Sequence, residues 1–211
     1  MRVEPLGDRG LLLRDLSAPA WMWAEALNEH SIEGLIEAYA SYDTVGLEID
    51  PTQFNESLLF TFEIPTPISF AQRKHEIPVC YGLGSDMEIV CDRLGVSSTE
   101  FEAIHSSSTY RCEAVGFCPG FPYLSGLDSR LQNVPRRPSP RTSIEPGAIA
   151  ITGAQCGIYP MQRPGGWAIV GRTPLTIVDP GDRYFPISAG DLIEFLPIDP
   201  SEFEKLVGER L

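Results

Sequence analysis

Lysine is scarce in this sequence of 211 residues, where only Lys74 and Lys205 occur. The pattern G-x-x-x-x-G-K-S/T is absent as well. Because that pattern cradles nucleotide phosphates with backbone N–H groups and one lysine, an ordinary P-loop nucleotide site is excluded. The sequence also lacks an apolar run of about eighteen residues, the length that a membrane-spanning helix needs. We therefore expect no membrane partner.

The five cysteines lie at positions 80, 91, 112, 118 and 156, and no two of them form a C-x-x-C pair. This odd number and this spacing predict neither a zinc site nor a disulfide framework, and we expect no bound metal. The first five residues carry charge and a proline where a signal peptide needs an apolar run. We therefore expect a cytoplasmic protein.

Positive charge is scarce overall, with a formal net charge of −13 and a pI near 4.6. Residues 86–105 have the spacing of a helix-turn-helix, but they hold five acids and one base, Arg93. Since a recognition helix must meet phosphates, we expect no nucleic-acid partner.

The predicted secondary structure divides the chain into two domains. Residues 1–72 predict a small α+β domain, with strands on either side of the turn at 7–10, a helix starting at Pro19, strands at 34–40 and 44–49, and a weaker β-like segment at 54–62. We expect a linker at 65–75. In the second domain, 73–211, serines open two predicted helices as capping boxes, Ser85 with Glu88 and Ser97 with Glu100.

Of the 19 prolines 13 lie after residue 115, as do 12 of the 19 glycines, and they separate short β-like runs. These runs are at 148–152, 167–170, 175–178 and 191–195. Short strands with turn signals at such spacing are typical of a β-barrel or a sandwich.

The segment 116–124, GFCPGFPYL, is too rich in proline and glycine for a helix and predicts a rigid loop. A second such segment, PGGW, follows at 164–167. Because rigid loops on a scaffold often carry binding sites, we take their residues as candidates for substrate binding. They are Phe117, Pro119, Gly120, Phe121, Tyr123, Gly165, Gly166 and Trp167.

His105 shares a predicted helix face with Phe101 and Ile104. One interpretation is a general base, or a hydrogen-bond donor to a bound anion. The alternative is a core histidine bonded to the backbone. Arg141 belongs to a segment, 129–144, that holds four arginines and no acid. Because the guanidinium fork suits carboxylates and phosphates, we expect Arg141 to contact an anion. The alternative is a solvated loop with salt bridges.

Gln155 and Tyr159 lie in a glycine-rich turn and could orient a small amide or carboxylate, while nearby N–H groups could hold an oxyanion. The alternative is a tight turn without a ligand. Cys118 and Cys156 lie in the same candidate loops, but no partner base is near them in sequence, and small buried cysteines are common. We therefore favour His105, Arg141, Gln155 and Tyr159 as the candidate catalytic residues.

Several blocks together resemble the KipI family, which is also called allophanate hydrolase subunit 1-like, or the family of the 5-oxoprolinase B subunit. They are RKHEIPVCYG at 73–82, HSSSTY at 105–110, GFCPGFPYLSGL at 116–127, GAQCGIYP at 153–160, PGGW at 164–167 and GRTPL at 171–175. The blocks keep their order over nearly the whole chain. The last block adds Arg172 to the candidate substrate-binding residues.

The resemblance implies an α+β fold, with a small N-terminal α+β domain followed by a cyclophilin-like β-barrel. It implies two partners, the 5-oxoprolinase C subunit, which is a second cyclophilin-like protein, and the A subunit; self-association is possible. The complex would open 5-oxo-L-proline to L-glutamate with ATP and Mg²⁺, for which this chain shows no motif. The resemblance leaves two alternatives open, an inhibitor of histidine-kinase autophosphorylation and a carboxyltransferase half that uses biotin from another protein.

Overall fold

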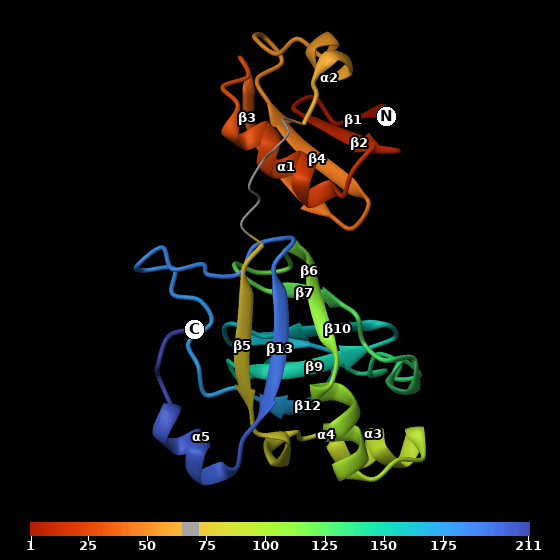
Figure 1. The fold of residues 1–211 in the computed structure, drawn as a ribbon, viewed down its shortest axis with the longest axis vertical. Helices are drawn as coiled ribbons and strands as arrows, with labels where there is room; N and C mark the ends of the chain where they lie inside the picture. The colour runs from red at the N-terminus through yellow and green to blue at the C-terminus, as the bar shows by residue number, and fades with distance from the viewer. Residues whose placement is uncertain (65–71) are drawn as a thin grey trace. The chain divides into compact units, whose positions relative to one another are not determined.

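The structure is a computed structural model that describes residues 1–64 and 72–211. The chain forms two compact units, 1–72 and 73–211, which is the division expected from the sequence (Figure 1). Most of the predicted linker 65–75 lies outside the described residues. Its last two residues already belong to a strand, because β5 begins at Lys74. Within the described residues, no helix is both long enough and apolar enough to span a bilayer.

Unit 1 is an antiparallel sheet with one packed helix. Its elements are β1 (Arg2–Leu6), β2 (Gly10–Arg14), α1 (Ala20–Glu29), β3 (Leu35–Ser41), β4 (Thr44–Ile49) and α2 (Ser57–Thr61). The strands follow the order β1-β2-β4-β3. Val45, Leu47 and Ile49 alternate inward along β4, and α1 buries Trp23 and Leu27. The predicted hairpin, helix and two strands are confirmed.

The segment 54–62, predicted to be β-like, instead contains the short helix α2. The Asn55 side chain accepts hydrogen bonds from the Ser57 N–H and hydroxyl and so starts this turn. Only Leu59 of the helix is buried. The sequence misleads here because a short apolar run does not distinguish a strand from a helix.

Unit 2 is dominated by strands. They are β5 (Lys74–Val79), β6 (Thr109–Val115), β7 (Pro122–Ser125), β8 (Arg141–Ile144), β9 (Ala148–Thr152), β10 (Gln155–Ile158), β11 (Arg163–Gly165), β12 (Ala168–Arg172) and β13 (Leu192–Pro197). The main sheet runs β5-β13-β6-β7-β10-β9-β12, and only the β5–β13 pair is parallel. Next to β5, Cys80 exchanges two backbone hydrogen bonds with Arg172 of β12.

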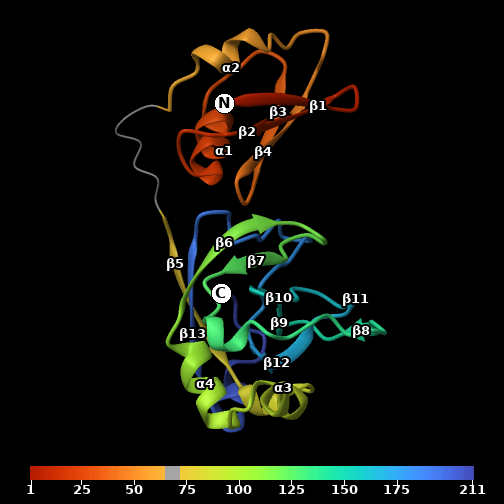
Figure 2. The same ribbon diagram turned by 90° about the vertical axis from the view of Figure 1, so that its right-hand side faces the viewer.

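Two predicted features of unit 2 need correction. The run 175–178 is not a regular strand, since Thr176 makes only an isolated bridge to Arg210. The capping box at Ser85 does not form, because α3 (Met87–Leu94) begins after Asp86, whose side chain makes no cap bond. The second box does form, with Ser97 and Glu100 at the start of α4 (Ser98–Ser106). Both figures place α3 and α4 side by side at one end of unit 2 (Figures 1 and 2).

The sheet β7-β10-β9-β12 is covered on both faces, and all five residues of β9 are buried. Because successive side chains of a strand point to opposite faces, each strand contributes to two clusters. Leu124, Ile149, Ile151, Cys156, Ile158 and Val170 belong to the main core. Ala148, Ala150, Tyr159, Trp167 and Ile169 belong to a second cluster on the other face. The fold is thus mixed α/β and sheet-dominated, and this second face positions the candidate site.

We expect Gly84→Ala to lower the free energy of unfolding by about 2 kcal/mol. A Cβ at Gly84, which follows the 3-10 turn η1 (Tyr81–Leu83), would overlap the backbone of Val170 in β12. Urea unfolding followed by circular dichroism measures the change. Gly82→Ala is the matched control, because its Cβ would meet only the Cys80 sulfur at 3.9 Å. Equal stabilities of the two variants would contradict this account of the packing.

Candidate functional site

Five aromatic side chains meet on the second face of the sheet, one from strand β7 and four from the segments that border strands β7, β10 and β12. They are Phe117, Phe121, Tyr123, Tyr159 and Trp167, which we call the aromatic cluster. The Phe121 ring lies at the centre, with its centroid 5.1 Å from that of Tyr159 and 5.6 Å from that of Trp167. Edge-to-face contacts at such distances are favourable for aromatic rings. The structure therefore brings together the two loops that the sequence marks as candidates.

The glycines of these loops allow close backbone packing. Gly120 has φ of +74°, and a Cβ there would overlap the Val178 side chain. A Cβ at Gly165 would overlap the Tyr159 hydroxyl. Gly166 accepts a hydrogen bond through its carbonyl from the Arg137 N–H at 2.7 Å. These glycines hold the cluster together, whereas Pro119 is exposed at its edge.

Phe117 is the exposed member of the aromatic cluster. Its side chain is 57% exposed, although one edge contacts Phe121 and Tyr159. Its φ of +64° lies in the left-handed region, which costs a residue other than glycine on the order of 1 kcal/mol. A large apolar ring thus projects from a strained loop beside the half-buried Tyr123.

Asp86 connects the arginine-rich segment to the sheet. Its carboxylate, which is 4% exposed, accepts hydrogen bonds from Arg137 at 3.0 Å, from Arg141 at 2.6 Å and from the Ile169 N–H at 2.8 Å. Its own N–H donates to the Ile169 carbonyl. Burial alone would raise the pKa of Asp86, but the Arg141 hydrogen bond, the Ile169 N–H and both guanidinium charges outweigh it and hold the pKa below its usual value.

This network corrects the expected role of Arg141. The guanidinium is not a free anion contact, because Asp86 already pairs with it. Asp86 was not among the residues predicted for the site, although an acid-free segment with four arginines in an acidic protein needs a counter-ion from elsewhere in the chain. One carboxylate serves two guanidinium groups, and among the described residues the buried Arg137 Nε and Arg141 Nη1 atoms have no hydrogen-bond partner.

Beside this network lies a cavity of about 240 Å³, which we call the two-arginine cavity. Arg141 and Arg172 line it, together with the polar residues Ser85, Ser143 and Glu145. Its apolar lining comes from Leu83, Ile144, Ala148, Ile169 and Gly171. Because Ile144, Ala148 and Ile169 also pack in the second cluster, the cavity and the aromatic cluster are contiguous. Two of the predicted site residues thus share one cavity.

His105 does not belong to this site. Its ring is fully buried between Phe101 and Phe195, and its Nδ1 lies 2.8 Å from the Tyr81 hydroxyl. Burial lowers its pKa to about 3, so the ring stays neutral near pH 7. The predicted role of general base does not fit this placement, because no substrate reaches a side chain inside the core. The alternative of a core histidine is correct for its burial, but its ring nitrogens face the side chains of Tyr81 and Cys156 and not the backbone.

Gln155 and Tyr159 do not act on one small ligand together. Gln155 begins β10 and Tyr159 directly follows its last residue, so the two lie four residues apart, roughly 13 Å in extended chain. Tyr159 is buried in the aromatic cluster, and a hydrogen bond links it to the Trp167 backbone. Their expected joint role is therefore corrected by the strand geometry.

The thiols of Cys118 and Cys156 also do not fit the role of a nucleophile. Cys156 is fully buried, and burial raises the pKa of its thiol far above the usual range. Cys118 is 8% exposed, and burial raises its pKa despite the nearby Arg163. Since the thiolate is the reactive form, burial disfavours both groups as nucleophiles.

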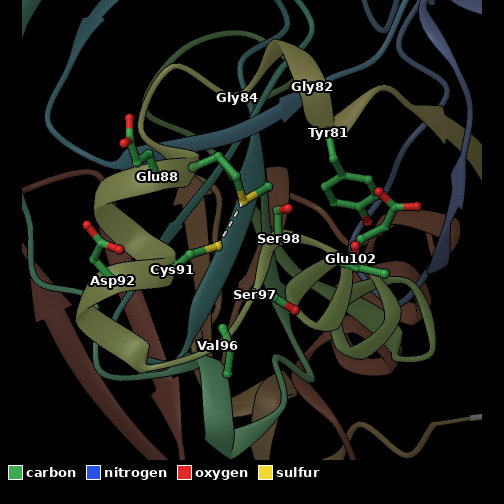
Figure 3. A pocket seen from close by; sticks show the side chains of 12 residues that line it. Tyr81, Gly82, Gly84, Glu88, Cys91, Asp92, Val96, Ser97, Ser98 and Glu102 are labelled. Atoms are coloured by element: carbon green, nitrogen blue, oxygen red, sulfur yellow. Dashed lines mark hydrogen bonds between the residues drawn. The ribbon is translucent and has the colours of Figure 1, made fainter.

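A larger pocket of about 640 Å³ lies between η1, α3 and α4. Figure 3 shows Glu88, Asp92 and Glu102 around it, with a dashed line for the hydrogen bond that the Cys91 thiol donates to the Met87 sulfur. This acidic lining disfavours phosphates and carboxylates. Of these two pockets, the two-arginine cavity is therefore the better suited to an anion.

The fold and the site define a sheet-dominated α/β protein with a small arginine-lined cavity. The chain belongs to the family described as carboxyltransferase domain, subdomain C and D, whose model matches residues 1–187. The family resemblance inferred from the motifs is confirmed by curated relatives, each named as the B subunit of 5-oxoprolinase. The Bacillus subtilis relative is 39% identical over 144 residues, which cover 67% of this chain and 60% of the relative. The Escherichia coli O157:H7 relative is 41% identical over 125 residues, which cover 58% and 57%.

The match thus spans about three fifths of the length of these relatives. Among solved structures, TTHA0988 is 34% identical with a TM-score of 0.81, over 90% of this chain and 40% of that one. PH0987 from Pyrococcus horikoshii is 33% identical with a TM-score of 0.59, over 96% and 100%. The Kluyveromyces lactis urea carboxylase, at 19% identity and a TM-score of 0.68 over 97% and 22%, shares the fold.

We expect Asp86→Asn to lower the free energy of unfolding by about 2 kcal/mol at pH 7, because it leaves two arginines without their counter-ion. The folded-state pKa of Asp86 is lowered. Its contribution is therefore present above the unfolded pKa of about 3.9 and is lost as pH falls through the folded pKa. The difference between wild type and variant should shrink below about pH 4.

Urea unfolding between pH 2.5 and pH 7 measures this difference. Asp92→Asn, at an exposed position of α3, is the matched control and should leave the stability unchanged. A difference for Asp86→Asn that persists unchanged to the lowest pH would contradict the ion-pair account.

Proposed function

We propose that this chain is the B subunit of a heteromeric, ATP-dependent 5-oxoprolinase, which opens 5-oxo-L-proline to L-glutamate. The observation that carries the proposal is the identity of 38–41% to three curated relatives that all bear the name of the 5-oxoprolinase B subunit. Their name as subunits supports a role within an enzyme complex. We further propose that the chain acts with the A and C subunits, in the cytoplasm, and is inactive alone.

The chemistry of the proposed reaction requires an anion site near a polarised carbonyl. A lactam is a stable amide, and its opening needs donors for the developing oxyanion. The substrate also carries a carboxylate, which guanidinium groups bind well. The two-arginine cavity supplies cationic and hydroxyl groups of this kind. We therefore propose that it contributes to substrate binding.

ATP and Mg²⁺ are required by the proposed reaction. Within residues 1–64 and 72–211, no three His, Cys, Asp or Glu side chains are grouped to hold a metal ion. The sequence also lacks the P-loop pattern that cradles nucleotide phosphates. We propose that the nucleotide binds elsewhere in the complex, and we assign no step through it to this chain.

We also propose that unit 2 is a cyclophilin-like β-barrel. Its main sheet starts at β5 and ends at β12, and the paired hydrogen bonds between Cys80 and Arg172 connect these two ends. Such a bridge is the expected link where a twisted sheet closes on itself. The antiparallel order β6-β7-β10-β9-β12 supports the same architecture.

The aromatic cluster supports a site shared with the C subunit. Phe117 exposes most of its ring beside Tyr123, and Arg136 lies over the Trp167 ring at 5.9 Å. Aromatic and arginine side chains are enriched where protein partners bind tightly. We propose that Phe117 lies beneath the C subunit in the complex, and that the shared site forms there.

A second candidate is the carboxyltransferase half of a urea carboxylase-type enzyme. The family description and the fold shared with the Kluyveromyces lactis urea carboxylase favour it. In that case turnover would depend on biotin carried by another protein. Dependence on a biotin carrier therefore separates the two candidates.

The proposal is tested by purifying the chain together with its two partners, the A and C subunits, and measuring ATP hydrolysis with and without 5-oxo-L-proline. We expect stimulation that disappears when this chain is omitted, because all three proteins are needed to complete the site. A stable complex without stimulation would favour the carboxyltransferase candidate. The absence of any complex would overturn the assignment to a 5-oxoprolinase.

We expect Phe117→Gly to lower the 5-oxoproline-dependent ATPase rate of the complex at least tenfold, since it removes the exposed ring that the C subunit would cover. The free energy of unfolding should change by about 1 kcal/mol or less, because lost ring contacts are offset by relief of the positive φ. Phe185→Ala, at another exposed phenylalanine, is the control. Equal rates for both variants would contradict the proposed role of Phe117.

A further inference from the structure

The charges of the two-arginine cavity are not paired with each other. Arg172 donates through Nε to the Pro146 carbonyl at 3.0 Å and lies over the Phe203 ring. Glu145 is exposed and lines the same cavity. Among the described residues, no acid lies within 4.0 Å of the Arg172 guanidinium and no base within 4.0 Å of the Glu145 carboxylate. One unpaired cation and one unpaired anion thus share a single cavity.

The pairing of Arg141 with Asp86 leaves Arg172 as the available cation of the cavity. Its Nη atoms could bind a ligand carboxylate, and the Glu145 carboxylate could accept a ligand N–H. The Ser143 hydroxyl accepts from Gln162 Nε2 at 2.6 Å, so its own proton is available for a ligand carbonyl. A ligand that forms a hydrogen bond with each of these three side chains carries a carboxylate and an amide.

The size and the apolar lining of the cavity restrict this ligand further. About 240 Å³ is below the roughly 300–1,000 Å³ of sites for drug-sized molecules. Leu83, Ile144 and Ile169 provide apolar contacts for methylene groups. The cavity therefore suits one small ring.

We propose that the two-arginine cavity binds a small cyclic amide with a carboxylate, of which 5-oxoproline is the example. Arg172 binds its carboxylate, Glu145 its lactam N–H and Ser143 its carbonyl. Leu83 and Ile144 contact the ring methylenes. The choice of 5-oxoproline rests on the proposed function, whereas the chemical class rests on the cavity itself.

Isothermal titration calorimetry on the whole chain, alone and in the complex with its two partners, tests this assignment. The probes are 5-oxo-L-proline, 2-pyrrolidone, which lacks the carboxylate, and cyclopentanecarboxylate, which lacks the amide. We expect 5-oxo-L-proline to bind at least tenfold more tightly than either fragment. Similar affinities for all three probes, or no binding of 5-oxo-L-proline in either state, would overturn the assignment.

Single substitutions distinguish the contributions of Arg172 and Glu145 to binding. Arg172→Met should weaken 5-oxo-L-proline binding at least tenfold and leave the affinity for 2-pyrrolidone unchanged, because only the carboxylate contact is lost. Glu145→Gln should weaken 5-oxo-L-proline and 2-pyrrolidone by the same factor. Arg183→Met, at an exposed arginine outside the cavity, is the matched control. Equal weakening by Arg183→Met and Arg172→Met would show a general charge effect and overturn the assignment.

The cavity assignment and the proposed reaction can be contradicted separately. If the complex hydrolyses ATP in response to 5-oxo-L-proline while Arg172→Met and Glu145→Gln leave its KM unchanged, the substrate binds elsewhere and the cavity assignment is wrong. If the chain binds 5-oxo-L-proline with the expected pattern while the complex shows no stimulated turnover, the cavity assignment holds and the proposed reaction is wrong.

Discussion

The carboxylate of Asp86 is the constraint on which the site depends. It accepts hydrogen bonds from Arg137 and Arg141 and from the backbone of β12 at Ile169. Three segments distant in sequence therefore meet at one buried charge. Because an unpaired charge at this depth would cost several kcal/mol, the segment 136–141 is held against the sheet. Arg137 in turn holds Gly166, and with it the loop that carries Trp167.

This network explains the neighbouring positions of two different surfaces. On one side the aromatic cluster presents Phe117 above a packed base of Phe121 and Tyr159. On the other side the two-arginine cavity gathers Arg172 and Glu145 around an apolar lining. The first surface has the chemistry of a protein interface and the second that of a small polar ligand site. Their contiguity through Ile144 and Ile169 supports a reaction site completed by a partner.

The titratable groups of the core have a different role. His105, Cys156 and Tyr81 lie close together inside unit 2. Burial lowers the pKa of His105 and raises the pKa of Cys156 and of Tyr81, so that the neutral form of each is favoured. Such groups are typical of catalytic sites when solvent reaches them. Here they stay neutral and act as packing groups with satisfied hydrogen bonds. Accessibility therefore separates the core cluster from the candidate site.

The sequence by itself determined the two units, most strands and the α4 capping box, because these features depend on local backbone preferences and periodicity. Its prediction of loops at 116–124 and 164–167 was right only in part, since Pro122–Leu124 belong to β7 and Pro164–Gly165 to β11. It also determined the family, through blocks that keep their order. Only the tertiary structure decided that Arg141 pairs with Asp86, that His105 is buried, that β10 separates Gln155 from Tyr159, and that Arg172 and Glu145 share a cavity. These facts depend on contacts between segments distant in sequence, as between Asp86 and Ile169 or between His105 and Phe195, and no local pattern encodes which charge meets which.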